Sequence, residues 1–498
     1  MIVTYIYAVL LPFITGDHWP AFLGQGASPI PEEKVPLVWS PQSGIAWKTA
    51  LLGKGQSSPV IWNDRVYVTS IEGTMKERCL VTALELQTGN VVWRREFPAS
   101  QPVRSNYFQS RAAPTPVVDA QAVYAFFETG ELVAIAHEGQ VLWKRSLVAD
   151  YGPFESNIGL AASPAYHAGT LFVLIDHEGP SYLLAVNSAD GSTLWKTARE
   201  SRVSYSSPML VPVGEAVHVV CSSAGSLDGY DPASGTLLWT YDRQVGGNRS
   251  ASPVACGPGR FVVAASPGMH NENEDEARQT NGIVQVVPTS HGYDIQFVWR
   301  THEAMPSFNS PLVHQGYAYW VNRAGVLFCF DAETGKKCYA HRLAQSCWAT
   351  PVGIGERIYV FGKDGVTSVV KAGPDFALLA ENTLWDPEEA GQEWLARRRA
   401  TGESPERPRA PMPQEQTTSA PTVGSAPEGQ RGGGGSDAPE TRTRADRRGL
   451  GRTLSIEEQR LREQGDNRFA DPVQYGVAIV PGWLIIRTGE MVYAVHQP

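Results

Sequence analysis

The sequence is poor in the residues that mark metal, redox and nucleic-acid sites. Only six of its 498 residues are cysteines, and no two of them are adjacent or form a C-x-x-C pair. We therefore expect isolated, half-buried thiols rather than a zinc site or a disulfide framework. The eleven histidines include no H-E-x-x-H motif, and the formal net charge of -9 leaves no basic stripe. Both absences argue against a metal site and against nucleic acid as a partner.

A long hydrophobic run is also missing. The apolar leader from Ile2 to Ile14 is too short to span a membrane as a helix, so we expect no transmembrane segment. It is similar to the hydrophobic core of a signal peptide that ends near Gly16, although no Lys or Arg precedes it. We therefore expect residues 1–16 to be a signal peptide and the protein to be exported to the periplasm or cell envelope. An ordinary apolar leader or a wrongly chosen start codon is the alternative.

Glycine (48), proline (36) and tryptophan (14) are abundant, which suits many short strands joined by tight turns. A proline that follows a small residue and precedes an apolar run recurs every 40 to 58 residues through the first seven repeats, and once more after residues 386–468. These prolines are Pro59, Pro114, Pro164, Pro208, Pro253, Pro311, Pro351 and Pro472. This spacing is typical of four-stranded propeller blades.

A second landmark is a turn glycine with an aromatic residue four positions later. It occurs as Gly89 with Trp93, Gly139 with Trp143, Gly191 with Trp195, Gly235 with Trp239 and Gly335 with Tyr339. The glycine supplies the positive φ of a tight hairpin, and the aromatic ring can fill the wedge between neighbouring blades. The seventh repeat has Ala377 where the aromatic belongs.

The two ends of the chain predict how the ring closes. The last repeat stops after three strands, whereas Trp47 near the N-terminus has no blade before it. We therefore predict an all-β, eight-bladed β-propeller in which N- and C-terminal segments share the last blade, with Ile45–Thr49 beside Met491–Val495. Closure removes the exposed sheet edges of a linear array.

These repeats resemble the pyrroloquinoline-quinone (PQQ) type of propeller repeat with its tryptophan-docking motif. The segments "DHWPAFLGQGAS", "AWKTALLGKGQSSPVIWNDRVYVTS" and "LIIRTGEMVYAV" are similar to exported, non-dehydrogenase PQQ-like propeller proteins. The resemblance covers residues 17–384 and 467–498. For quinoprotein dehydrogenases it implies PQQ with calcium, a general base and a vicinal cysteine pair. This chain has no such pair, so we expect no cofactor and keep PQQ with calcium as the alternative.

One segment interrupts the repeats. Residues 386–468 contain 14 Arg, no Lys, 15 acidic residues and a single aromatic, Trp394. Such low-complexity composition offers too little apolar surface to offset the entropy of ordering. We therefore expect a disordered insertion between blades 7 and 8, either a solvated excursion or a tether. The expected domains are the propeller at 17–385, the insertion at 386–468 and the remaining strands of blade 8 at 469–498.

Residues three before each landmark proline, and their neighbours, are expected at the rim of the central channel. The candidate ligand-binding residues there are Gln56, Arg111, Tyr205, Arg249, Asn309 and Trp348. Aromatic rings with a cation and amides suit a sugar, a peptide or an aromatic ligand; plugging of the channel by large side chains is the alternative. The acidic loop Ser266–Gly282 lacks the order of a calcium-binding loop, so we expect it to be solvated.

No catalytic residue is expected, because the sequence has no nucleophile-elbow pattern and the rim set contains no carboxylate. We expect an exported, non-catalytic binding or assembly scaffold, acting as a monomer on a protein or saccharide partner. A PQQ-dependent oxidoreductase and a carbohydrate- or peptide-binding sensor are the alternatives. Because function depends on sites and not on the fold, the repeat alone does not decide among them.

Overall fold

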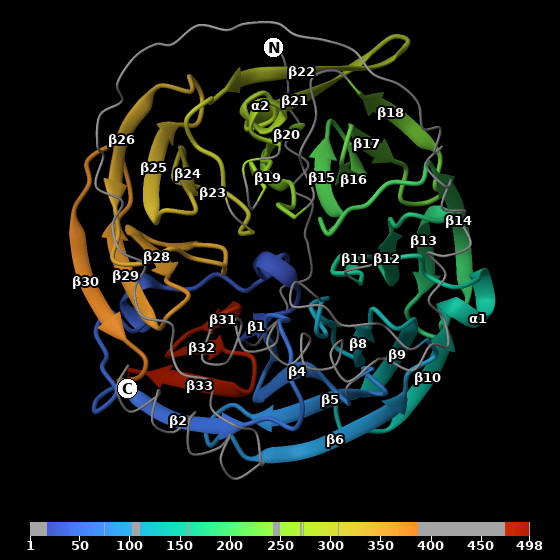
Figure 1. Cartoon of the computed structure of the whole chain (residues 1–498), viewed down its shortest axis with the longest axis horizontal. Helices are drawn as coiled ribbons and strands as arrows, with labels where there is room; N and C mark the ends of the chain where they lie inside the picture. The colour runs from blue at the N-terminus through green and yellow to red at the C-terminus, as the bar shows by residue number, and fades with distance from the viewer. Residues whose placement is uncertain are drawn as a thin grey trace, which may run out of the picture.

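Short antiparallel strands form eight sheets, which follow one another around a central axis as the blades of a propeller (Figure 1). The computed structural model describes residues 17–73, 75–101, 110–156, 159–242, 250–268, 271, 273–306, 308–386 and 474–497. Within each sheet the strands are neighbours in sequence, apart from β1 and β2 near the N-terminus. Each blade therefore forms from local hairpins, and its first strand faces the channel.

The first four blades take up the N-terminal half of the chain. Blade 1 consists of β1 (His18–Trp19), β3 (Val60–Trp62), β4 (Arg65–Glu72), β5 (Arg78–Glu85) and β6 (Val91–Pro98). Blade 2 consists of β7 (Val117–Val118), β8 (Ala122–Phe126), β9 (Glu131–Ala136) and β10 (Val141–Ser146). Blade 3 consists of β11 (Ala165–His167), β12 (Thr170–Ile175), β13 (Ser181–Asn187) and β14 (Thr193–Arg199). Blade 4 consists of β15 (Met209–Val213), β16 (Ala216–Ser223), β17 (Ser226–Tyr230) and β18 (Leu237–Tyr241).

The remaining blades continue in the same order. Blade 5 consists of β19 (Val254–Gly257), β20 (Arg260–Val263), β21 (Gly282–Thr289) and β22 (Gly292–Arg300). Blade 6 consists of β23 (Leu312–His314), β24 (Tyr317–Val321), β25 (Val326–Asp331) and β26 (Lys337–Arg342). Blade 7 consists of β27 (Val352–Ile354), β28 (Arg357–Phe361), β29 (Val366–Lys371) and β30 (Leu378–Thr383). Blade 8 consists of β31 (Gly476–Val480), β32 (Trp483–Arg487), β33 (Met491–His496) and β2 (Ile45–Ala50).

Helices are few and short in the described residues. They are η1 (Phe22–Gly24), η2 (Glu32–Lys34), α1 (Leu147–Tyr151) and α2 (Glu274–Arg278). No described helix has the length and apolar character that crossing a membrane requires.

The ring closes as the sequence predicts. Strand β2 pairs with β33, with Trp47 opposite Ala494 and Ala50 opposite Met491. Figure 1 shows this pair, coloured blue and red, side by side in the last blade. The prediction that both ends of the chain share blade 8 is confirmed.

The small residue before each landmark proline has a structural role. Its hydroxyl accepts a hydrogen bond from the equivalent backbone amide of the preceding blade, and six such bonds are seen among the described residues. They run from Ser58 to Thr115 (2.9 Å), Thr115 to Ser163 (2.9 Å), Ser163 to Ser207 (2.9 Å), Ser207 to Ser252 (2.9 Å), Ser252 to Ser310 (2.9 Å) and Ser310 to Thr350 (3.0 Å). We call these residues the hydroxyl ring. They connect blades 1 to 7 around the channel.

The hydroxyl ring corrects one landmark. In blade 2 the hydroxyl belongs to Thr115 and β7 begins just after Pro116, so Pro116 and not Pro114 is the equivalent proline. The sequence "AAPTPVV" offers two prolines, and only the pairing across blades distinguishes them.

Outer-strand tryptophans connect the opposite edge of the blades. Five indole Nε1 groups each donate to a carbonyl in the third-to-fourth-strand turn of the next blade. The bonds run from Trp47 to Leu86 (2.9 Å), Trp93 to His137 (2.7 Å), Trp143 to Ser188 (2.8 Å), Trp195 to Pro232 (3.0 Å) and Trp299 to Ala332 (2.9 Å). The turn glycine is required for this contact, since a Cβ on Gly89 (φ +71°) would lie 2.4 Å from the Trp47 ring.

Blades 4 and 7 depart from this arrangement. Trp239 donates instead to His218 of its own blade, at 3.0 Å. In blade 7 the strand register places Ala380, and not Ala377, at the aromatic position, because Val369 pairs with Ala380 just before the bulge. Trp39, from the N-terminal segment, lies in the same apolar cluster as Ala380.

Residues 17–35 cover one mouth of the channel. The Lys34 carbonyl accepts from Gly482 in the β31–β32 turn, and the Pro20 carbonyl accepts from Val118 at the end of β7. Strand β1 extends blade 1 inward by pairing with β3, and Figure 1 shows this segment at the centre of the ring. These contacts lie on the face formed by the turns between first and second strands, so residues 17–35 do not cover the opposite face.

Two predicted segments lie outside the described residues. They are the expected signal peptide at 1–16 and nearly all of the expected insertion at 386–468. In sequence the insertion lies between β30 and β31, and both assignments stay predictions.

Candidate functional site

The candidate site lies where the connections between blades and the second-to-third-strand loops meet around the channel. A pocket at this mouth is lined by Lys54, Gly55, Gln56, Arg111, Tyr475, Gly489 and Glu490, which we call the mouth pocket. Its residues come from blades 8, 1 and 2 and from the connections between them. Because an antiparallel meander returns to the same edge after two strands, these loops necessarily share one face.

Gln56 and Arg111, both expected at the rim, are held together by structural hydrogen bonds. The Gln56 amide donates to the Arg111 carbonyl at 2.9 Å, and the Arg111 amide donates to the Gln56 Oε1 at 2.9 Å. The Gln56 side chain therefore fixes the loop that carries Arg111.

A buried ion pair holds the same loop from beneath. Lys76 Nζ lies 3.1 Å from Glu128 Oε1 and donates to the Ser110 carbonyl, while the Ala112 amide donates to Glu128. Burial lowers the pKa of Lys76, whereas the carboxylate of Glu128 opposes this shift. The pair thus clamps the residues on both sides of Arg111 and orients it at the mouth.

An aromatic row borders the mouth pocket. Phe308 meets Trp348 edge-on with ring centroids 5.4 Å apart, and Trp348 lies 5.8 Å from Tyr475. Phe308 is 45% exposed although it is large and apolar. Aromatic side chains prefer such edge and tilted contacts, and an exposed ring at the end of the row is available to a partner.

The other predicted rim residues have different surroundings. Asn309 is 1% exposed, and neither of its amide atoms has a hydrogen-bond partner among the described residues, so it is not presented at the mouth. Tyr205 is half-buried between blades 3 and 4 and does not line the mouth pocket. Arg249 lies outside the described residues.

Sequence reasoning missed Lys54, Tyr475 and Glu490. Lys54 Nζ and Glu490 Oε1 are 3.6 Å apart and join the two ends of the chain across the pocket. The offset of three residues before each proline pointed to Phe469 in blade 8, which is not described, whereas Tyr475 follows that proline. No local signal marks these residues, because ring closure alone brings them together.

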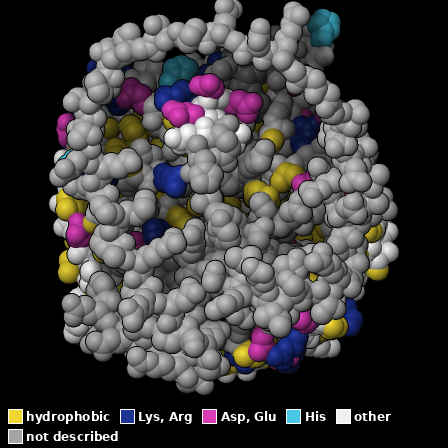
Figure 2. All heavy atoms as spheres, in the orientation of Figure 1, with side chains coloured by type: hydrophobic (Ala, Val, Ile, Leu, Met, Phe, Trp, Pro, Cys, Tyr) yellow, Lys and Arg dark blue, Asp and Glu magenta, His cyan; other side chains and the backbone are white. Residues whose placement is uncertain are grey.

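The acidic loop of blade 5 forms α2, and Figure 2 shows its acidic side chains gathered on the viewer's face. Glu274 forms an ion pair with Arg278 one turn later. The described residues contain no group of three His, Cys, Asp or Glu side chains that could hold a metal ion. His270 and Glu272 of this loop lie outside those residues.

The residues at the mouth do not fit calcium-bound PQQ. Calcium takes six to eight oxygen ligands, and the mouth pocket supplies one carboxylate, Glu490, which already faces Lys54. All six cysteines are unpaired in the structure and none are neighbours in sequence. The mouth pocket has a volume of about 10 Å³, roughly that of one water molecule, so its described residues offer a contact surface and not a cavity for a small ligand.

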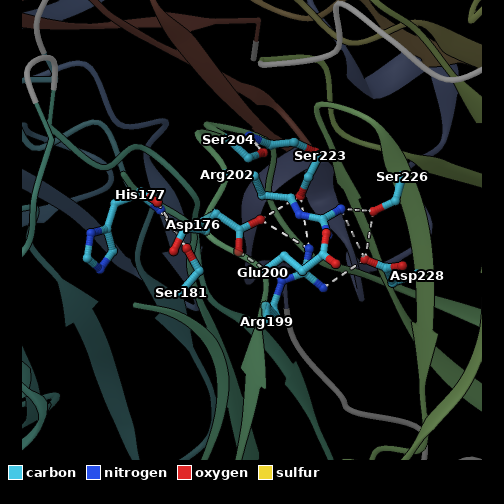
Figure 3. A network of polar contacts seen from close by, with 12 residues as sticks. Asp176, His177, Ser181, Arg199, Glu200, Arg202, Ser204, Ser223, Ser226 and Asp228 are labelled. Carbon is cyan, nitrogen blue, oxygen red and sulfur yellow. Dashed lines mark hydrogen bonds and ion pairs between the residues drawn. The ribbon is translucent and has the colours of Figure 1, made fainter. Parts of the chain in front are cut away.

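A second polar network joins blades 3 and 4 (Figure 3). Arg199, at the end of β14, forms a fork with Asp176 at 2.8 and 3.1 Å and also reaches Asp228 on β17 at 3.1 Å. The side chains of Arg199 and Asp176 are at most 1% exposed. Bidentate geometry compensates part of the cost of burying these charges. The network connects two blades and makes no contact with the mouth pocket.

The eight four-stranded repeats and the closure of the ring by β2 and β33 define the class of protein. It is an eight-bladed β-propeller built from PQQ-type repeats. A family model described as outer membrane protein assembly factor BamB (PQQ_2) matches residues 37–152 and 136–270. Residues 37–270 are thus similar to this family, and the chain as a whole is an eight-bladed β-propeller.

Solved structures share this architecture. BamB from Moraxella catarrhalis aligns with a TM-score of 0.51 at 11% identity, over 90% of this chain and 96% of that chain. The quinohemoprotein alcohol dehydrogenase from Comamonas testosteroni aligns with a TM-score of 0.47 at 12% identity, over 74% and 73% of the two chains. At such identities the likeness to BamB establishes the fold alone. Among curated proteins none matches the sequence significantly.

Proposed function

We propose that this protein is an exported, non-catalytic scaffold of the cell envelope that binds a partner protein at the mouth of its channel. One observation carries this proposal: the aromatic row ends in the exposed Phe308 beside the mouth pocket, whereas residues 17–35 cover the opposite mouth. Residues 17–35 do not lie over the mouth that carries Phe308, so among the described residues this mouth is the face that a partner can reach.

The chemistry of the mouth suits a protein partner. Aromatic and arginine side chains are enriched in protein interfaces, where a few buried rings supply most of the binding energy. Lys54, Arg111 and Glu490 add both signs of charge beside the rings. The description of the matching family as an outer membrane protein assembly factor supports a partner among envelope proteins.

Site-specific photocrosslinking tests the proposal. A photoreactive benzoylphenylalanine placed at Phe308 should form a discrete adduct in the native host, which mass spectrometry should identify as one envelope protein. Leu194 is the matched control, since it is 52% exposed on the outer strand of blade 3. The Trp348→Ser variant, which breaks the aromatic row, should weaken the adduct at Phe308.

Equal adducts from Phe308 and Leu194, or none from Phe308, would contradict the proposal. Light scattering should give the mass of a monomer for the isolated protein.

A saccharide is the second candidate partner, because exposed rings can stack on sugar faces. Oligosaccharide titration followed by the fluorescence of wild type and Trp348→Phe would reveal it. Addition of PQQ with calcium, read by absorbance and thermal shift, should show no stoichiometric binding and no dye reduction with alcohols. Tight binding with turnover would establish the quinoprotein alternative instead.

A further inference from the structure

The joint between blades 6 and 7 is built differently from the five joints that an indole closes. Tyr339 takes the aromatic position, and its buried hydroxyl has no hydrogen-bond partner of ordinary length among the described residues. The carbonyl of Gly373, in the third-to-fourth-strand turn of blade 7, accepts instead from the Cys329 thiol at 3.4 Å. The Gly373 amide donates to the Tyr319 hydroxyl at 2.8 Å. A thiol thus occupies the place that an indole N–H holds elsewhere.

A second cysteine lies beside this thiol. Cys329 pairs with Tyr339 and Phe330 pairs with Lys337, so Cys338 is the extra residue of a bulge between neighbouring strands. Cys329 and Cys338 belong to the same apolar cluster. Cys338 adjoins Tyr339, the residue opposite Cys329, and in a bulge two residues of one strand face a single residue of the other. A disulfide spans Cα atoms about 4.4–6.8 Å apart, which is the scale of the spacing between neighbouring strands.

The two thiols differ in access. Cys329 is fully buried, whereas Cys338 is half-buried on β26, the outermost strand of its blade. Burial raises the pKa of Cys329, and the nearby Cys338 adds to this shift. Cys338 is therefore the sulfur that a reagent reaches first.

We propose that Cys329 and Cys338 are a redox-active pair that forms a disulfide and gives the joint between blades 6 and 7 two states. The Cys338 thiolate attacks a small-molecule disulfide such as oxidised glutathione and releases one glutathione thiolate. The Cys329 thiol then loses its proton to solvent, and its sulfur attacks Sγ of Cys338 and releases the second glutathione thiolate. The protein loses two protons and two electrons, and the glutathione disulfide gains the two electrons.

The disulfide state changes the joint. A disulfide sulfur carries no proton, so Cys329 can no longer donate to the Gly373 carbonyl. Strands β25 and β26 become covalently connected, while the turn of blade 7 at Gly373 loses one of its two bonds to blade 6. Because the raised pKa of Cys329 disfavours its thiolate, we expect the second step to be slow and to accelerate as the pH rises.

Peptide mapping of the full-length protein tests the pair. The protein is equilibrated with oxidised and reduced glutathione at pH 8, quenched in acid, unfolded, alkylated with N-ethylmaleimide and digested with trypsin. Cleavage after Lys336 and after Lys337 separates the two cysteines, so the disulfide should join peptide 324–336 to peptide 338–342. The linked species should dominate under oxidising conditions and disappear with dithiothreitol.

Two variants make the outcome specific. Cys338→Ser should abolish the linked species, and both peptides should then be read separately. Cys256→Ser is the matched control, since Cys256 is also half-buried and burial raises its pKa to about 11, but it lies on β19 of blade 5. It should leave the linkage unchanged.

Amide hydrogen exchange of the reduced and the oxidised wild-type protein measures how the disulfide changes the joint between blades 6 and 7. Amides of residues 371–377 should exchange faster in the disulfide state. The proposed disulfide between Cys329 and Cys338 would be contradicted if all six thiols were still alkylated after oxidative equilibration. It would also be contradicted by a stable glutathione adduct on Cys338 alone. Linkage without any change in exchange at residues 371–377 would overturn the two-state joint.

Discussion

The backbone amide of Ser58 donates a hydrogen bond to the hydroxyl of Thr115 at 2.9 Å, across the joint between blades 1 and 2. The same bond recurs at five more positions of the hydroxyl ring, so one side-chain oxygen per blade satisfies a buried amide of its neighbour. An unsatisfied buried amide is costly, which explains why a hydroxyl precedes the landmark proline in these blades.

Ser163→Ala should therefore destabilise the ring out of proportion to its size. It removes the acceptor of the Thr115 amide and leaves a buried N–H unpaired, at a cost of about 1–3 kcal/mol. Thermal unfolding should show a lower midpoint. Ser163→Thr is the control, because Thr115 and Thr350 hold the same position in other blades. If the Ser163→Ala and Ser163→Thr proteins have the same unfolding midpoint, the hydroxyl ring contributes nothing to stability.

Trp47→Ala should weaken the closure between blades 8 and 1. Trp47 is 9% exposed, packs on Gly89 and donates to the Leu86 carbonyl, so we expect a loss of about 3–5 kcal/mol from the cavity and the lost bond. Chemical denaturation measures the change. Leu194→Ala, at an exposed outer-strand site, should change stability by no more than about 0.5 kcal/mol. A similar small effect for Trp47→Ala would show that closure does not depend on the indole.

Arg199→Met should be strongly destabilising. It leaves the carboxylate of Asp176 buried without its cation, which costs about 3–5 kcal/mol, while Asp228 keeps Arg202 at 4.0 Å. The exposed pair Arg65–Asp64 is the comparison, and Arg65→Met should cost at most about 1 kcal/mol. Comparable midpoints for the two variants in urea would refute the distinction between the buried network and a surface pair.

Stability should fall as the pH drops below about 6.5, the ordinary histidine value, partly through His177 and His218. Burial lowers the pKa of both imidazoles, and each Nδ1 accepts a hydrogen bond, from Gly179 and from Trp239 respectively. Because the pKa of each imidazole is lower in the folded than in the unfolded protein, the unfolded chain binds these protons at a higher pH than the folded protein does. This contribution is therefore complete above the unfolded value and is lost as the pH falls toward the folded one.

The measurement compares melting at pH 7.5 and 5.5. His218→Asn keeps an acceptor oxygen near Nδ1 but cannot titrate, so its midpoint should fall less between the two pH values than that of wild type. His291→Asn, at an exposed turn, should behave like wild type. An unchanged pH response in His218→Asn would assign the effect to other groups.

Much of the fold follows from the sequence by local chemistry. Each blade packs on its neighbours through the same contacts, and these require a hydroxyl before a proline, a turn glycine and an outer aromatic residue. The spacing of these residues therefore predicts the strands and their number. The orphan Trp47 likewise predicts closure, since an unpaired outer strand and a truncated last repeat leave one consistent arrangement. Local patterns could not separate Pro114 from Pro116 or Ala377 from Ala380, because register depends on the partner strand.

The site was within reach of the sequence only in part. Gln56, Phe308 and Trp348 stand three residues before their landmark prolines, so their place at one mouth was predictable, whereas Arg111 lies five residues before Pro116. Lys54 and Glu490 meet there only because the ring closes, and the covering of the other mouth by residues 17–35 depends on contacts far apart in the chain. The sequence by itself therefore determined the repeating blade, whose interactions are local. Only the tertiary structure decided which side chains share the mouth opposite residues 17–35, because these contacts form between segments that the repeat pattern treats as independent.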